Sequence, residues 1–193
     1  ALAVPDDPTT GTYGGIARGS FNFWRSQYYR GVTDGGAAGS SANIQSYMTT
    51  LALRCVRGNN KPDLWIGDAT YFQFYVNSLQ AIQRIQSENG DGKAGAGFGP
   101  ELAFYGGGMA ATVVMGGGIS GAVSPTQATS GATSAHMWGL NTDYIFWRPH
   151  RDRNFVPIGG ERQSVNQDAV VKLFGVAGNI TSSGPQFSGV LIA

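Results

Sequence analysis

Two regular apolar patterns decide the fold, and both lie in "SANIQSYMTTLALRCVRGNNKPDLWIGDATYFQFYVNSLQAIQRI" (residues 41–85). The first has the spacing of an amphipathic helix, with apolar residues that recur on one face. That face consists of Ile44, Tyr47, Met48, Leu51 and Cys55. Ser40 or Ser41 can cap the start of this helix, and Gly58 can end it. The pattern therefore predicts a helix that is buried along one side.

The second half of the stretch predicts a strand followed by another helix. "KPDLWIG" (61–67) indicates a short buried strand, and Asp68 can cap the helix after it. The apolar stripe of that helix comprises Tyr71, Phe72, Tyr75, Leu79 and Ile82. The turn between strand and helix lacks the glycine pattern and the lysine of a nucleotide-binding loop. The glycine series at 90–100 contains Lys93 but follows a helix, so it predicts a flexible loop and not a phosphate cradle.

The remainder of the chain is rich in predicted strands. "ELAFYGGG" and "AATVVMGGG" indicate short strands before a Gly/Ser/Thr/Ala-rich loop at 116–135. Val, Ile, Phe and Trp content predicts further strands in "HMWGLNTDYIFWRP", "NFVPI", "SVNQDAVVKLFGVAGNIT" and "FSGVLIA". Helix, strand and helix followed mostly by strands is typical of the α+β class.

Composition narrows the class of protein. The formal net charge of +1 over 193 residues excludes a strongly basic protein that coats nucleic acid. Only 13% of residues are charged and 30 are glycine, which suggests a surface covered in part by other protein chains. The single cysteine, Cys55, cannot form an internal disulfide and fits a buried helix face. No apolar run approaches the roughly 20 residues that span a bilayer.

The N-terminal residues 1–40 lack sustained periodicity and predict an extended segment. Its aromatic residues cluster in "FNFWRSQYYRG" (21–31), where we expect Phe21, Phe23 and Trp24 to anchor on a neighbouring surface.

The residue types needed for catalysis or metal binding are not arranged in a usable pattern. His136 and His150 are too far apart for two ligands on one helix, and neither belongs to an HExxH motif. Asp143, Asp152 and Glu161 lie among arginines, which favours salt bridges. No serine stands in a GxSxG elbow. We therefore predict no catalytic, metal or cofactor-binding residues, although a hydrolase whose paired carboxylates meet only in the fold stays open.

The stretch "HMWGLNTDYIFWRPHRDRNF" (136–155) combines aromatic and basic residues as a nucleic-acid grip does. Overall neutrality favours a strand and a tight turn begun by Pro149, with the arginines paired to Asp152 or to a neighbouring chain. Trp and Arg often dominate contact energies between subunits. The predicted subunit-interface residues are Trp24, Arg25, Trp147, Arg148, Arg151 and Arg153.

Four segments, in order, resemble the major capsid proteins of tailed bacteriophages. They are "DDPTTGTYGGIARG…FWRSQ", the stretch 41–85, "NTDYIFWRPHRDRNFVPI" and "QSVNQDAVVKLFGVAGNIT". They cover most of the chain, and 106–135 matches least. The resemblance implies a wedge-shaped α+β subunit with peripheral and axial domains. Such subunits form hexamers and pentamers around packaged double-stranded DNA.

The resemblance also implies a division of the chain. Residues 1–40 would be an extended, aromatic-containing arm or peripheral segment, and residues 41–60 would be the spine helix of the peripheral domain. Residues 61–150 would form the axial domain, with its Gly-rich loop at 106–135. Residues 151–193 would be the strands that return to the peripheral domain. The N-terminal arm and long extended β-loop of the family would precede Ala1 and are absent from this sequence.

Expected partners are copies of the chain itself, and scaffolding, portal or decoration proteins, with only weak non-specific contact to the packaged DNA and no membrane. The expected location is the virion shell, assembled in the host cytoplasm. The family has no active site to carry over. Two other functions stay open: a carbohydrate-acting hydrolase, and a monomeric binding module that uses the aromatic residues at 21–29.

Overall fold

The computed structural model describes residues 4–80, 102–106, 109–116, 135–160, 162–163 and 170–192. The chain divides into two units, of which the first comprises Ala1–Thr142 with Gly184–Ala193 and the second Asp143–Ser183. The described residues form a mixed α+β structure with more strand than helix, as the sequence predicts. The predicted glycine series at 90–100 and most of the predicted loop at 116–135 lie outside the described residues.

A six-stranded sheet forms the centre of the first unit. In spatial order its strands are β3 (Gln27–Arg30), β12 (Gly189–Ile192), β7 (His136–Leu140), β4 (Leu64–Gly67), β6 (Met109–Met115) and β5 (Leu102–Gly106). The pairs β3–β12 and β4–β6 are parallel, and the other neighbours are antiparallel. The sheet thus joins strands from three of the four segments into which the resemblance divides the chain.

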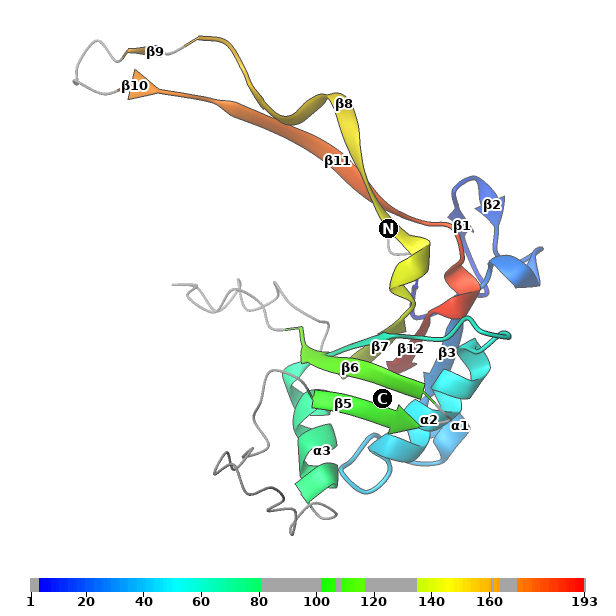
Figure 1. Cartoon of the computed structure of the whole chain (residues 1–193). Coiled ribbons are helices and arrows are strands. Elements are labelled where there is room, and N and C mark those ends of the chain that lie inside the picture. Colours follow the sequence, from blue (N-terminus) through cyan, green and yellow to red (C-terminus); the bar gives the residue numbers. More distant parts are fainter. Residues whose placement is uncertain are drawn as a thin grey trace. The chain divides into compact units, whose positions relative to one another are not determined.

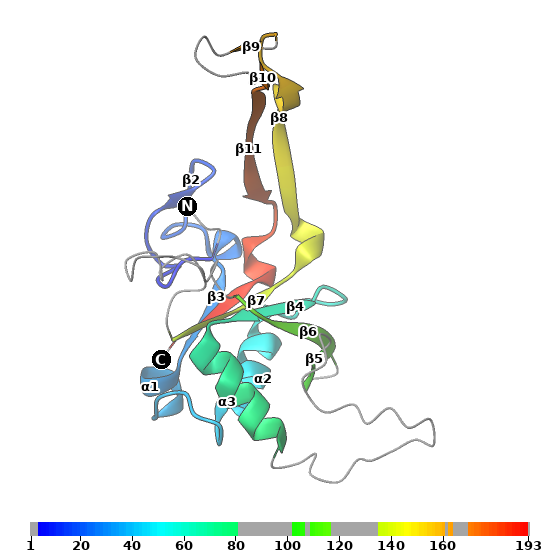
Figure 2. The same cartoon turned by 90° about the vertical axis from the view of Figure 1, so that its left-hand side faces the viewer.

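Helices α2 (Ile44–Cys55) and α3 (Ala69–Gln80) cover one face of this sheet (Figure 1; Figure 2). The whole predicted face of α2 is buried, which confirms the first pattern. In α3, Tyr71 and Tyr75 are buried as predicted, Phe72 and Leu79 are half-buried, and Ile82 lies outside the described residues. Trp65 of the predicted strand β4 lies beneath the helices, with its ring edge-on to Phe104 at 5.5 Å.

The start of α2 differs from the prediction that Ser40 or Ser41 caps it. The helix begins after Asn43, whose side chain makes no capping bond to the helix. Instead, Asn43 Oδ1 accepts the backbone N–H of Ser40 at 2.6 Å. The Ser40 carbonyl in turn accepts the N–H groups of Asn43 and Ile44. The turn before the helix is therefore closed by Asn43 and Ser40 together, because a short polar side chain competes well for local backbone groups.

The end of α2 differs from the prediction that Gly58 ends the helix. The guanidinium of Arg57 donates to the carbonyls of Arg54 and Val56 at 2.8 and 2.7 Å, so this cation satisfies groups at the C-terminal end. The helix itself ends at Cys55. Gly58 does not end it: with a φ of +61° it shapes the tight turn that follows, between Arg57 and Asn60.

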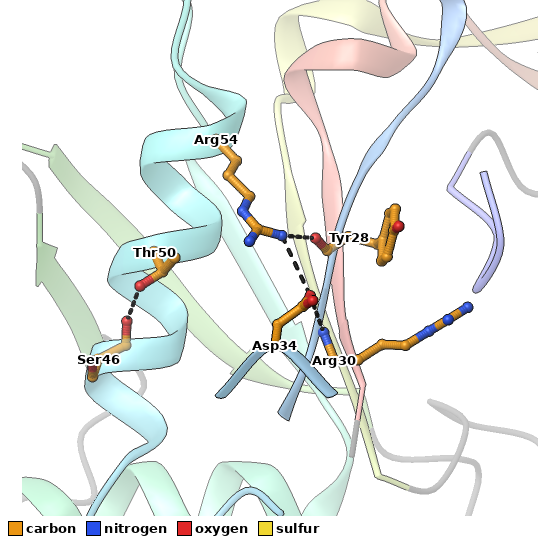
Figure 3. A network of polar contacts seen from close by, with 6 residues as sticks. All are labelled: Tyr28, Arg30, Asp34, Ser46, Thr50 and Arg54. Atoms are coloured by element: carbon orange, nitrogen blue, oxygen red, sulfur yellow. Dashed lines mark hydrogen bonds and ion pairs between the residues drawn. The ribbon is translucent and has the colours of Figure 1, made fainter. Parts of the chain in front are cut away.

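Arg54, in the last turn of α2, contacts a neighbouring strand. Its Nη1 donates to the carbonyl of Tyr28 in β3 at 2.7 Å and lies 3.5 Å from Asp34 Oδ2 (Figure 3). The same carboxylate oxygen accepts the backbone N–H of Arg30 at 3.0 Å. Arg54 thus links α2 to β3, the edge strand of the sheet. The ion pair itself contributes little, because both side chains are reached by water.

Asp68 caps α3 as predicted and also holds a second segment. Its Oδ1 accepts the backbone N–H of Tyr71 at 2.9 Å, which is the capping bond. Its Oδ2 accepts the N–H of Ala135 at 2.9 Å, and its own N–H donates to the carbonyl of His136 at 3.0 Å. Only 6% of Asp68 is exposed. One buried carboxylate therefore joins the start of α3 to the start of β7.

The N-terminal segment folds on itself more than an extended arm does. It contains the short strands β1 (Thr12–Tyr13) and β2 (Ile16–Ala17), a 3₁₀ turn Asn22–Trp24 and the helix α1 (Gly31–Gly35). The indole Nε1 of Trp24 donates to the Tyr13 carbonyl at 2.9 Å. Phe21 and Phe23 contact each other and stay exposed, so their predicted anchoring on a neighbouring surface stays a prediction.

Candidate protein interface

The second unit is built on a long two-stranded ribbon, in which β8 (Ile145–Pro157) pairs antiparallel with β11 (Phe174–Ser182). From here on, the arm means these two strands, β8 and β11, and not the N-terminal segment. Figure 1 shows the arm as an extended ribbon, continued by the short pair β9 (Arg162–Gln163) and β10 (Val170–Val171). Within the described part of this unit, no further strand or helix covers either face of the arm.

The predicted tight turn at Pro149 is wrong. The single strand predicted for 136–149 is in fact β7, which ends at Leu140, a 3₁₀ turn Thr142–Tyr144, and the first part of β8. The chain then continues past Pro149 as strand for eight more residues, to Pro157. Proline is tolerated here because β8 is an edge strand with an irregular register just after it.

Two irregularities interrupt the pairing of β8 with β11. Pro149 lies opposite Gly178 and Asn154 opposite Val176, so residues 150–153 of β8 face Ala177 alone. Phe155 is a further extra residue, and its φ of +54° lies in the left-handed region that aromatic residues rarely adopt. Bulges of this kind bend a strand and redirect its side chains. They place Arg151 and Arg153 in the irregular part of β8, whereas Arg148 pairs in register with Asn179.

The arginines of β8 are exposed and do not form the predicted ion pair within the chain. Arg148 Nε donates to Thr181 Oγ1 of β11 at 3.1 Å. Asp152 is instead engaged through its backbone N–H, which donates to His150 Nδ1 at 3.2 Å. Among the residues that the structure describes, no ion pair joins Asp152 to Arg148, Arg151 or Arg153. The alternative, that these arginines contact a neighbouring chain, stays a prediction.

One face of the arm carries a row of large apolar side chains. Alternate residues of a strand point to the same face, so Phe174, Val176 and Ile180 share a face of β11. Trp147 of β8 lies opposite Ile180 on that face. We call these four residues the apolar stripe; their exposed fractions are 63%, 49%, 63% and 54% in the order Phe174, Val176, Ile180 and Trp147. Exposed apolar side chains gathered on one face in this way are typical of protein interaction sites.

A glycine makes room for the tryptophan of the stripe. Gly178 lies between Val176 and Ile180 on the same face, and a side chain built on it would collide with the Trp147 indole. The indole therefore lies over the backbone of β11 at Gly178. This position fixes a large aromatic surface on the ribbon while half of it remains exposed.

The predicted interface residues separate into two groups. Trp147, Arg148, Arg151 and Arg153 all lie on β8 of the arm. Trp24 and Arg25 belong to the first unit and bind their own chain, with Arg25 donating to the carbonyls of Arg18 and Gly19. The three residues of the apolar stripe on β11 were not among the predicted interface residues. The alternation of Phe174, Val176 and Ile180 indicated a strand with one apolar face. The sequence did not indicate that, among the described residues, β8 is the one strand paired with β11.

Other candidate groups do not form a reactive site in the described residues. His136 Nε2 lies 3.1 Å from Asp6 Oδ1 in the first unit, and His150 belongs to the second. No group of three or more His, Cys, Asp and Glu residues in the described ranges is placed to hold a metal ion. Burial raises the pKa of the Cys55 thiol to about 12, so the thiol is protonated at neutral pH. Within these ranges, no helix is both long and apolar enough to span a membrane.

Comparison with protein-family models gave no match for this chain. A search among curated proteins gave no match either. A function is therefore inferred from the arm and from the sequence resemblance.

Proposed function

We propose that this chain is the structural subunit of a viral capsid shell, with the peripheral and axial domains of the tailed-phage capsid fold. It assembles with copies of itself into hexamers and pentamers that enclose packaged double-stranded DNA. The observation that carries the proposal is the arm, a two-stranded ribbon with an exposed apolar stripe. The order of the resembling sequence segments supports the same function.

The energetics of the arm favour association. A lone two-stranded ribbon is marginally stable in water, since each strand has one neighbour and both faces are wet. Burying a large apolar side chain contributes roughly 1.5–3 kcal/mol, and the four residues of the stripe are each about half exposed. Covering the stripe therefore contributes roughly 3–6 kcal/mol. A subunit that makes several such contacts at once offsets the entropy lost on assembly.

The charged residues of the arm fit the edge of such a contact. Arg148, Arg151 and Arg153 lie on the same strand as Trp147 and are exposed, so they guide encounter and register more than they add affinity. The proposed partners are other copies of the chain, together with scaffolding, portal or decoration proteins. Contact with packaged DNA would be weak and non-specific, and the proposed location is the virion shell, assembled in the host cytoplasm.

Electron microscopy of the protein, expressed alone from its complete gene, tests this function. We expect closed shells or rings of uniform diameter. Trp147→Ala should reduce their yield, whereas Leu53→Ala removes an equally exposed apolar side chain from the first unit and serves as the matched control (56% against 54% exposed). Dispersed monomers at every salt concentration would refute the shell. Monomers that bind a ligand through Phe21 and Phe23 would favour a binding module.

A further inference from the structure

The two outer edges of the arm differ in how well they are protected against pairing with another strand. Proteins protect an exposed edge with charges, prolines and bulges. β8 has all three, in Arg151 and Arg153, Pro149 and Pro157, and the extra residue Phe155. β11 has none: its nine residues, "FGVAGNITS", contain no charge and no proline, and the extra residues of the pair all lie on β8. An open edge of this composition is a template for strand addition.

We infer that the outer edge of β11 pairs antiparallel with β11 of a second copy of this chain, across a two-fold axis at Gly178. The inference deepens the proposed function, on which it rests for self-association, by naming the surface and the partner. In this register Val176 lies opposite Ile180 of the second copy, and Ile180 opposite its Val176. An isologous contact requires such self-complementarity: if one residue of the first copy contacts a second residue of the other, that second residue in the first copy contacts the first residue of the other.

The distribution of charge selects a second copy paired through β11. Two β11 strands bring no like charges together, since neither carries any. Pairing β8 with β8 would instead concentrate Arg148, Arg151 and Arg153 of both copies, and like charges across strands are destabilising. An acidic partner protein would favour β8 over β11, so the uncharged edge points to a copy of the same strand.

The product of this pairing is a four-stranded sheet in the order β8, β11, β11, β8. Three or more strands with an apolar face are needed for a sheet to be stable on its own, and the isolated arm has two. The stripe is doubled across the axis, with Gly178 at the centre and one Trp147 indole on each side. Gly178 has no side chain to separate the two copies where they come closest.

A pair of charge variants tests the register. In the inferred pairing Ala177 lies opposite Asn179 of the second copy, and both are exposed. Ala177 has no paired residue on β8, so either a positive or a negative side chain can be introduced there with little effect within the arm. The variant Ala177→Lys/Asn179→Lys places like charges opposite each other twice. Its matched control, Ala177→Glu/Asn179→Lys, keeps the lysine beside Arg148 but creates two opposite-charge pairs.

Sedimentation equilibrium of the whole chain, below the concentration at which larger assemblies form, gives the dimer Kd of each variant. We expect the double-lysine variant to bind itself at least about tenfold more weakly than its control, given two cross-strand pairs of changed sign. Equal Kd values, or a wild-type chain that stays monomeric, would overturn the inference. Circular dichroism spectra that coincide for the two variants show that both arms are folded.

A disulfide cross-link separates this inference from the proposed shell. Ala177→Cys/Asn179→Cys should give covalent dimers under mild oxidation, while Cys55 stays out of the reaction because it is fully buried. Shells that form without any cross-linked dimer would overturn the β11 pairing and leave the shell intact. Cross-linked dimers in a protein that never forms shells would support the pairing and refute the proposed function.

Discussion

Replacing Asp68 tests whether one buried carboxylate organises the first unit. Asp68→Ala removes both acceptors, Oδ1 from the Tyr71 N–H and Oδ2 from the Ala135 N–H. Asp68→Asn keeps one carbonyl oxygen but turns an NH₂ group toward the other donor. The two substitutions therefore separate the loss of both bonds from the loss of one.

The expected magnitudes follow from the burial of each donor. Loss of a helix N-cap costs about 0.5–2 kcal/mol. The half-buried N–H of Ala135, left without its acceptor, costs about 1–2 kcal/mol more. Asp68→Ala should thus lower the free energy of unfolding by roughly 1.5–4 kcal/mol. At about 2–4 °C per kcal/mol for a unit of this size, Tm should fall by about 3–16 °C. Asp68→Asn should lose about 1–2 kcal/mol.

Urea unfolding followed by far-ultraviolet circular dichroism is the appropriate assay, because α2 and α3 both lie in the first unit. Asp63→Ala is the matched control: Asp63 also accepts from a backbone N–H, that of Thr142 at 2.8 Å, but in an exposed position where water can replace it. A loss for Asp68→Ala below about 0.5 kcal/mol, or no larger than that of Asp63→Ala, would refute the role assigned to burial.

Three further predictions concern the arm and the core. Trp147→Ala should impair assembly while moving Tm by no more than about 2 °C, since substitutions of exposed residues change monomer stability little. A thermal melt in which monomer stability falls as much as assembly does would contradict this. Gly178→Ala should push the Trp147 indole into water and shift its fluorescence to the red, whereas Gly160→Ala, with open space around it, should not. Burial raises the pKa values of Cys55 and Tyr71 from 9.0 and 10.0 to about 12, so both favour the neutral form when folded. Stability should be complete below about pH 9 and fall from there toward pH 12, and a urea midpoint that stays constant from pH 8 to 11 would contradict this.

Local patterns predicted the parts of the fold whose partners are close in sequence. The faces of α2 and α3 and the strand between them follow from apolar spacing, and the cap at Asp68 follows from its place before a helix. The choice of Ser40 or Ser41 as a cap failed because several short polar residues compete before α2, and the one that closes the turn is Asn43.

The candidate interface was only half predictable. The composition of 147–153 indicated a contact, and these residues do lie on the exposed arm. Pro149 nevertheless favoured a turn, because the register that absorbs it depends on Gly178, 29 positions further along the chain. To predict the stripe on β11 one must know that β11 pairs with β8 alone in the described part of the chain, which is a property of the topology and not of the strand.

The place of β12 in the sheet has a consequence for synthesis on the ribosome. β12 lies between β3 and β7, yet it follows β3 by about 160 residues. At roughly 5–20 residues per second, β3 waits on the order of 10–30 s before its neighbour is made. During that interval β3 and the edge of β7 that receives β12 lack their final partner, and the arm is synthesised in the meantime. The nascent chain therefore passes through a stage with open strand edges, when a chaperone would be most useful.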